Sequence, residues 1–323
     1  MEALSDILLL PSISISLFVD SSLFLLLFYA FFLSLSLLKN YNKSDTSNAF
    51  YKLENRSHLL VTIVTLSIFI KILLLPFFLN TLNTLTAFIP GAMCSAGVIS
   101  ANEFGNPTLF FKLATLLIAL LWLRLNNVDE VTPKQPYFQK KLWLFNILFF
   151  SIAMEFFLEI AFFTHLVTDS PVMCCTSIFN TNTQKDFLIT LPHIYLLILF
   201  IVLFFSSILL KHYKKRFLSS LSILLFSYIA YYTLVYILSP YIYELPTHKC
   251  PYCMMQNEYY GIGYFIYISI FMALYYSCVS LFFNFDTKDY KKSSFYLTLF
   301  FLLTLSSFVL YLAKNETLLS PLF

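Results

Sequence analysis

The chain has 323 residues, of which 59% are hydrophobic and only 11% are charged, and its formal net charge is +3. Soluble domains carry about 25% charged residues. With 38 Phe and 22 Tyr, there is more apolar surface than one soluble core could hide, and repeated apolar runs of about 20 residues match the thickness of a bilayer. The composition predicts an all-α, polytopic integral membrane protein surrounded by lipid. The small basic excess argues against nucleic acid as a partner.

The chain begins with residues 7–19, which are apolar but too short to cross a bilayer. Pro11 and Asp20 interrupt this run, so we expect an interfacial or re-entrant segment there. Eight transmembrane spans follow, and together they form a single transmembrane domain over residues 1–323. The spans are expected at about 21–38, 59–79, 108–125, 142–163, 188–210, 217–239, 262–284 and 294–313.

The basic residues predict the orientation of these spans. Fifteen of the 20 Lys and Arg residues lie in the connections after the first, third, fifth and seventh spans. Because basic connections stay in the cytoplasm, both termini are expected outside. Trp122 and Trp143 flank one such connection, as residues of an interfacial aromatic belt would. The remaining connections, roughly 80–107, 164–187 and 240–261, then become the outer loops.

Five of the six cysteines fall in these outer loops. In each loop a proline stands four residues before a cysteine, and the three cysteines so preceded are Cys94, Cys175 and Cys250. They lie 81 and 75 residues apart, close to the length of one helical hairpin plus its inner connection. This spacing suggests a repeat of three hairpins, as in many transporters, with chance as the alternative. If the loops converge, these three cysteines form a three-thiolate site.

The tetrapeptide Cys250-Pro-Tyr-Cys253 resembles the active site of glutaredoxins over those four residues. The resemblance implies a pair that cycles between dithiol and disulfide. Cysteine pairs at the outer membrane face are also similar in layout to the disulfide-bond-forming and vitamin-K-epoxide-reductase-like membrane enzymes, which typically have fewer spans. That layout implies catalytic Cys250 and Cys253, a thiol protein as partner, and a quinone or a second cysteine pair as the electron acceptor.

The methionines favour a different chemistry. Four of the six methionines after Met1 lie within two residues of an outer cysteine, and disulfide exchange needs none there. Thiolate and thioether sulfurs are soft ligands that favour Cu(I), and imidazole suits several transition metals. The candidate metal ligands are Cys94, Cys174, Cys175, Cys250, Cys253, His248, Met93, Met173 and Met254.

Four charged residues are predicted inside spans, namely Lys71, Lys112, Glu155 and Glu159. A charge at that depth costs about 2.5–3.5 kcal/mol on insertion scales, so such residues face the bundle interior and pair. Glu155 and Glu159 are four positions apart and therefore share a helix face. Two interpretations stay open: Lys–Glu pairs that fix the helix register, or a polar pathway for protons, a cation or a quinol headgroup.

The sequence contains no Walker loop and no dinucleotide fingerprint, so no nucleotide is expected. Three functions remain. The first is binding, handling or transport of a soft metal ion, with copper foremost and an extracytoplasmic metallochaperone as partner. The second is a membrane thiol–disulfide oxidoreductase, the one enzymatic alternative. The third is a structural or assembly subunit whose outer loops are stapled by disulfides. The expected location is a bacterial inner membrane, with the cysteine loops on the periplasmic face.

Overall fold

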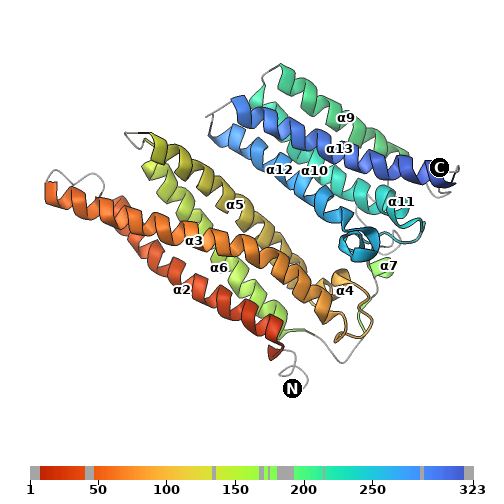
Figure 1. The fold of residues 1–323 in the computed structure, drawn as a ribbon, viewed down its shortest axis with the longest axis horizontal. Coiled ribbons are helices and arrows are strands. Elements are labelled where there is room, and N and C mark those ends of the chain that lie inside the picture. Colours follow the sequence, from red (N-terminus) through yellow and green to blue (C-terminus); the bar gives the residue numbers. More distant parts are fainter. Residues whose placement is uncertain are drawn as a thin grey trace. The chain divides into compact units, whose positions relative to one another are not determined.

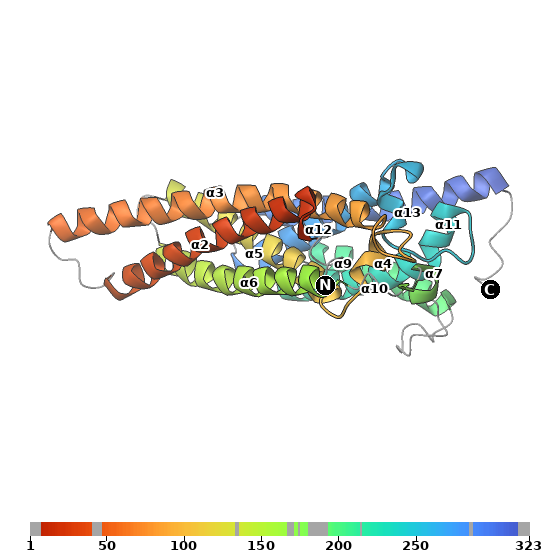
Figure 2. The ribbon, with the colours of Figure 1, turned by 90° about the horizontal axis from the view of Figure 1, so that it is seen from below.

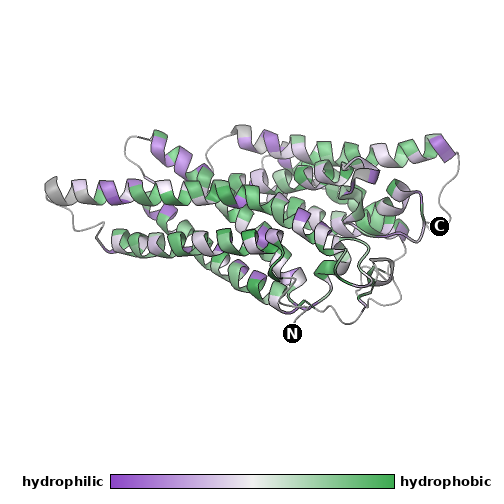
Figure 3. Cartoon of the chain, turned by 60° about the horizontal axis from the view of Figure 1, so that its bottom comes forward, coloured by the Kyte–Doolittle hydropathy of each residue, from purple (hydrophilic) through white to green (hydrophobic). Residues whose placement is uncertain are grey.

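A computed structural model describes residues 8–40, 47–132, 136–166, 171–173, 175–179, 193–213, 215–283 and 287–315. Within these ranges the secondary structure consists of helices only, and eight of the helices are long and apolar enough to cross a membrane. The predicted fold class and number of spans are therefore confirmed. The ribbon is apolar along most of each long helix, with hydrophilic stretches toward the ends (Figure 3). The orientation of the spans stays a prediction.

The chain divides into two compact units. Unit 1 comprises Met1–Pro90 and Val98–Val172, and unit 2 comprises Gly91–Gly97 and Met173–Phe323. The short segment Gly91–Gly97 thus leaves the first half of the sequence to join the second unit. The single transmembrane domain expected over residues 1–323 stays a prediction.

Unit 1 is a four-helix bundle of α2 (Pro11–Asn40), α3 (Ser47–Leu85), α5 (Gly105–Val131) and α6 (Phe138–Thr164). Helix α2 packs on α3 and α6, and α5 packs on α6 and α3, so that every helix has two neighbours. Figures 1 and 2 show these four helices running side by side. The short helix α4 (Ser95–Ile99) lies in the connection between α3 and α5.

The prediction of a separate interfacial or re-entrant segment at residues 7–19 is wrong, because helix α2 runs without a break from Pro11 past Asp20. Pro11 is the first residue of the helix, where the missing N–H of proline costs nothing. Asp20 is 1% exposed and forms an ion pair with Lys71 of α3. A partner of opposite charge on the next helix thus allows an acidic residue to stay inside the span.

Trp122 does not belong to an aromatic belt. Its side chain is fully buried in the core of unit 1, and its indole N–H donates a hydrogen bond to the carbonyl of Lys141. Lys141 in turn pairs with the buried carboxylate of Asp129. Trp143, in contrast, is 63% exposed, as a belt residue would be. The spacing of the two tryptophans around one connection could not distinguish these environments.

Unit 2 contains the long helices α9 (His193–His212), α10 (Arg216–Thr233), α12 (Ile262–Phe282) and α13 (Thr287–Asn315). Helix α10 packs on α9 and on α12, and α12 packs on α13. Between α9 and α13 the rings of Phe204 and Phe301 stack at 4.1 Å between centroids. A small helix α7 (Cys175–Ile178) precedes the bundle.

Helix α10 continues through a π-helical turn, η2 (Leu234–Leu238), into α11 (Ser239–Tyr243). Proline lacks an N–H and clashes with the carbonyl four residues before it, so Pro240 cannot continue a regular α-helix. The wider turn absorbs this defect, and the Ser239 hydroxyl donates to the carbonyl of Leu234. Glu244 then ends the helix in the left-handed region, at φ 56°.

The predicted repeat of three hairpins is not confirmed. Its first and last hairpins correspond to α3–α5 and α10–α12, which do pack as neighbours. Its middle hairpin would consist of α6 from unit 1 and α9 from unit 2. The repeat therefore stays a prediction.

Candidate functional site

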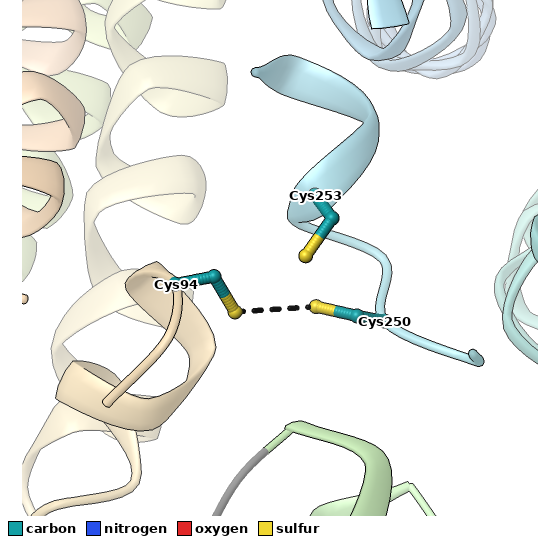
Figure 4. A group of neighbouring side chains, drawn as sticks. All are labelled: Cys94, Cys250 and Cys253. Carbon is teal, nitrogen blue, oxygen red and sulfur yellow. Dashed lines mark hydrogen bonds between the residues drawn. The ribbon is translucent and has the colours of Figure 1, made fainter. Parts of the chain in front are cut away.

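Three cysteines of unit 2 meet in what we call the thiol cluster, composed of Cys94, Cys250 and Cys253. Cys94 stands directly before α4, Cys250 lies in the turn after α11, and Cys253 begins the 3₁₀ helix η3 (Cys253–Met255). The Sγ atoms of Cys94 and Cys250 are 3.5 Å apart. All three sulfurs lie within 4.8 Å of one another, and they point toward a common centre (Figure 4).

The thiol cluster is buried. Cys94, Cys250 and Cys253 are 1%, 0% and 4% exposed, and they belong to the hydrophobic core of unit 2. The distance of 3.5 Å between two sulfurs exceeds the ~2.05 Å of a disulfide bond. Around a metal ion with metal–sulfur bonds of about 2.3 Å, ligand sulfurs lie about 3.8–4 Å apart. The three sulfurs are therefore close enough together to hold one metal ion.

Two tyrosine hydroxyls fix the backbone on which the CxxC cysteines stand. Tyr243 donates to the carbonyl of Cys250, and Tyr267 of α12 donates to the carbonyl of Pro251 over 2.7 Å. In the next turn, the backbone N–H of Gln256 donates a hydrogen bond to the carbonyl oxygen of Cys253, with 2.9 Å between N and O. These bonds satisfy carbonyls that would otherwise be buried without partners, and they hold the turn in one conformation.

Gly263 allows η3 to lie against the first turn of α12. A Cβ at this position would come within 2.6 Å of Met254 Cγ and 3.0 Å of the Met254 backbone carbon. Both distances are shorter than ordinary carbon–carbon contacts, so any larger residue would push η3 away from the helix. Glycine at position 263 is thus a packing requirement of the thiol cluster.

The surroundings of the thiol cluster have a low effective dielectric constant. Burial raises the pKa of the Tyr252 hydroxyl, with smaller contributions from nearby Tyr231 and Cys250. Burial also lowers the pKa of Lys249, whose ammonium lies 5.5 Å from the centre of the Tyr236 ring. Both shifts favour neutral side chains. In such an environment the attraction between thiolates and a bound cation is stronger than in water.

The other predicted ligands fall into three groups. Met254 is fully buried beside the cluster, whereas Met93 and Met173 are 75% and 68% exposed. His248 packs its ring against Tyr243 at 4.5 Å between centroids and stays outside the group of converging sulfurs. Cys174 and the side chain of Cys175 lie outside the described residues. The structure thus brings together Cys94, Cys250 and Cys253, and the role of Cys175 stays a prediction.

A second group of reactive side chains lies inside unit 1. We call it the charge cluster, and it consists of Asp20 on α2, Lys71 on α3, Lys112 on α5, and Glu155 and Glu159 on α6. Every member is at most 9% exposed. The four residues predicted inside spans therefore do meet, and they meet as one network rather than as separate pairs.

The contacts of the charge cluster are short. Lys71 Nζ lies 2.5 Å from Asp20 Oδ1 and 2.9 Å from Glu155 Oε1. Lys112 Nζ lies 3.2 Å from Glu155 Oε1 and 2.7 Å from Glu159 Oε2. Each ammonium thus bridges two carboxylates, and Glu155 connects the two lysines. Desolvated charges need such partners, because a buried ion without one is strongly destabilising.

Sequence reasoning missed Asp20 as a member of this cluster. Its position after a short apolar run suggested the end of an interfacial segment. Ser16 stands one helical turn before it, and the Ser16 hydroxyl donates to Glu159 Oε1 at 2.9 Å. The i, i+4 spacing of the Ser16 hydroxyl and the Asp20 carboxylate, which puts both on one face of a helix, was the available signal.

Comparisons of this chain with models of protein families, with curated proteins and with solved structures find no match. The thiol cluster and the charge cluster are therefore the features of this chain that bear on its function.

Proposed function

We propose that the protein binds a soft metal ion, with Cu(I) as the leading candidate, through the thiolates of Cys94, Cys250 and Cys253. The supporting observation is that three buried sulfurs from separate parts of unit 2 lie within 4.8 Å of one another. Thiolate ligands select soft ions such as Cu(I). A buried site shielded from water also protects such an ion from exchange with solvent ligands.

The cellular role follows from the predicted orientation. If the basic connections face the cytoplasm, the thiol cluster lies at the outer face of the membrane. We propose that it acquires or hands on copper there, at a bacterial inner membrane, with a periplasmic metallochaperone as the donor or acceptor. His248 and Met254 stand close to the cluster in sequence and are candidates for ligands during transfer. Cys174 and Cys175 are candidates for a second ligand set.

The test is a Cu(I) competition titration with a chromophoric chelator, carried out anaerobically on the reduced protein in detergent. We expect one tightly bound ion, and a loss of affinity of more than about 100-fold in each of Cys94→Ser, Cys250→Ser and Cys253→Ser. Cys278→Ser is the matched control, because Cys278 lies half-buried on α12, away from the cluster. X-ray absorption should count three sulfur neighbours. Equal Cu(I) affinity in the wild type and the triple serine variant would refute the proposal.

A second candidate is a thiol–disulfide oxidoreductase, and the 3.5 Å between Cys94 and Cys250 sulfurs favours it. Formation of a disulfide would release two protons and two electrons from the two thiols, and a quinone would accept both to become a quinol. Unit 2 has an apolar cavity of about 250 Å³ between α9, η2 and α13, and we propose that it holds the isoprenoid chain of the quinone. None of the three cysteines lines this cavity.

Thiol alkylation during a redox titration separates the candidate functions. Protection of the cluster by Cu(I), with alkylation at all potentials in its absence, supports metal binding. A disulfide between Cys94 and Cys250 that forms and opens reversibly supports the oxidoreductase. Cysteines that stay blocked at every potential in the folded protein, and that react after unfolding only when a reductant is added, support structural disulfides in the outer loops of a structural or assembly subunit.

A further inference from the structure

The charge cluster of unit 1 has one more negative group than positive groups. Its titratable members come from all four helices: Asp20 from α2, Lys71 from α3, Lys112 from α5, and Glu155 and Glu159 from α6. If all five are ionised, three carboxylates face two ammonium groups. A net charge buried inside a membrane-spanning bundle is strongly unfavourable.

Two carboxylate oxygens of the cluster lack a hydrogen-bond donor. Glu155 Oε2 and Asp20 Oδ2 are both buried without a hydrogen-bond partner among the described residues. The nearest ammonium to Asp20 Oδ2 is that of Lys112, at 3.8 Å, which is too long for a hydrogen bond. Glu155 itself is 2% exposed. The two lysines therefore satisfy only part of the acceptor capacity of the cluster.

Space for a proton carrier lies next to Glu155. Lys71, Lys112 and Glu155 line a narrow cavity together with the hydroxyl-bearing Ser67 and Thr115. The cavity is large enough for about one water molecule. Glu155 thus combines a buried carboxylate oxygen that has no donor with a place beside a small cavity, whose few polar lining residues include both lysines of the cluster.

We propose that the charge cluster is a proton-binding site, which takes up one proton on its three carboxylates and thereby becomes neutral. The added proton supplies a donor where the lysines supply none. A monovalent cation would also balance the charge, because the carboxylates of Asp20, Glu155 and Glu159 lie close enough together to hold an ion, and the test below therefore includes it as the competing occupant. A divalent cation would leave the cluster with a net positive charge. This site is independent of metal binding by the thiol cluster in unit 2.

Infrared difference spectroscopy on the purified protein in detergent tests the proposal. At acidic and neutral pH the wild type should show the carbonyl stretching band of a buried protonated carboxyl group, which disappears at alkaline pH. Asp20→Asn, Glu155→Gln and Glu159→Gln each leave two carboxylates with two lysines. Every one of these three variants should therefore lack the band. Glu103→Gln is the matched control, because Glu103 is exposed in the same unit, and it should keep the band.

The proposal has three ways to fail. A wild type without such a band at any pH would overturn it. So would a band that only one of the three variants removes, because the proton would then belong to a single acid rather than to the charge balance. A band that vanishes at constant pH when sodium replaces choline would assign the site to an alkali cation. Proton release measured by direct titration, one fewer in each variant than in the wild type, checks the count independently.

Discussion

The two units bury their reactive groups in different ways. In unit 1, five charged side chains project from regular helices, and their positions follow from helix register and from the packing of neighbouring helices. In unit 2, three thiols come from the irregular stretches 91–97 and 244–261, where tyrosine hydroxyls and a glycine fix the backbone. The charge cluster should therefore be sensitive to any change of charge. The thiol cluster should be sensitive to changes in turn geometry and packing.

The units also share a feature of topology. In both units, the long connection lies between the second and the third long helix. It runs from α3 to α5 in unit 1, and in unit 2 from α11, which continues α10, to α12. Each connection carries a cysteine four residues after a proline, at Cys94 and at Cys250. Yet the first of these connections contributes Gly91–Gly97 to unit 2. The thiols of both connections thus gather in one unit.

The largest expected effect is in unit 1. Lys112→Met leaves three carboxylates with one ammonium, and breaking a buried ion network in this way costs about 3–5 kcal/mol. Unfolding in mixed detergent micelles measures the loss, which should shrink at acidic pH as protons neutralise the carboxylates. Lys314→Met is the control, because the Lys314–Glu244 pair is exposed and contributes at most about 1 kcal/mol. Equal losses of unfolding free energy in the two variants would show that the buried charge cluster is no more important for stability than an exposed ion pair.

The second-largest loss of stability is expected from a packing change in unit 2. Gly263→Ala forces a Cβ against Met254 and displaces η3, at a cost of about 1–3 kcal/mol. Because Cys253 begins η3, the Cu(I) affinity should fall together with stability. Ile268→Ala, on an exposed face of the same helix, should leave the affinity unchanged. A Gly263→Ala protein with wild-type Cu(I) affinity would show that the thiols tolerate movement of η3.

A smaller effect is expected from one tyrosine hydroxyl. Tyr267→Phe removes the donor to the Pro251 carbonyl, and loss of one such hydrogen bond costs about 0.5–1.5 kcal/mol. The matched change Tyr264→Phe, one helical turn away and half-exposed, should be neutral. Faster alkylation of the cluster cysteines in Tyr267→Phe alone would show that the hydroxyl holds the turn closed. Identical alkylation rates in both variants would contradict this role.

The smallest effect concerns the exposed methionines. Met93→Ala and Met173→Ala should change stability by less than about 0.5 kcal/mol and leave Cu(I) affinity unaltered, because both side chains are largely exposed. Met254→Ala, in contrast, empties a buried site and should cost about 2–5 kcal/mol. A weaker Cu(I) complex in either exposed variant would restore the sequence-based assignment of these residues as ligands.

The sequence predicts the helices well because bilayer thickness and hydropathy determine them. It also identifies Lys71, Lys112, Glu155 and Glu159 as interior residues, since a charge inside a span has to find a partner. It does not identify Asp20, because whether a helix continues through an acid depends on a lysine 51 residues further along the chain. The interior position of Trp122 escapes prediction for a similar reason, namely that its partner is a backbone carbonyl on the next helix.

The composition of the thiol cluster shows a different limit. The regular proline–cysteine spacing predicts that Cys94 belongs with Cys250, and the structure places them in contact. That spacing predicts Cys175 as the third sulfur, with Cys253 only as an additional ligand. The position of Cys253 instead follows from the 3₁₀ turn after Pro251 and from the close approach of that turn to Gly263. Such packing depends on residues that carry no ligand chemistry of their own.

The buried position of Trp122 has a practical consequence. Both tryptophans of the chain, Trp122 and Trp143, belong to unit 1, and unit 2 contains none. Intrinsic tryptophan emission therefore reports on unit 1 alone. The emission maximum of the buried Trp122 indole should move to longer wavelength when the helices of unit 1 separate on unfolding. Changes at the thiols can be followed separately through chelator absorbance. Tryptophan emission and chelator absorbance thus give two independent optical signals, one for each unit.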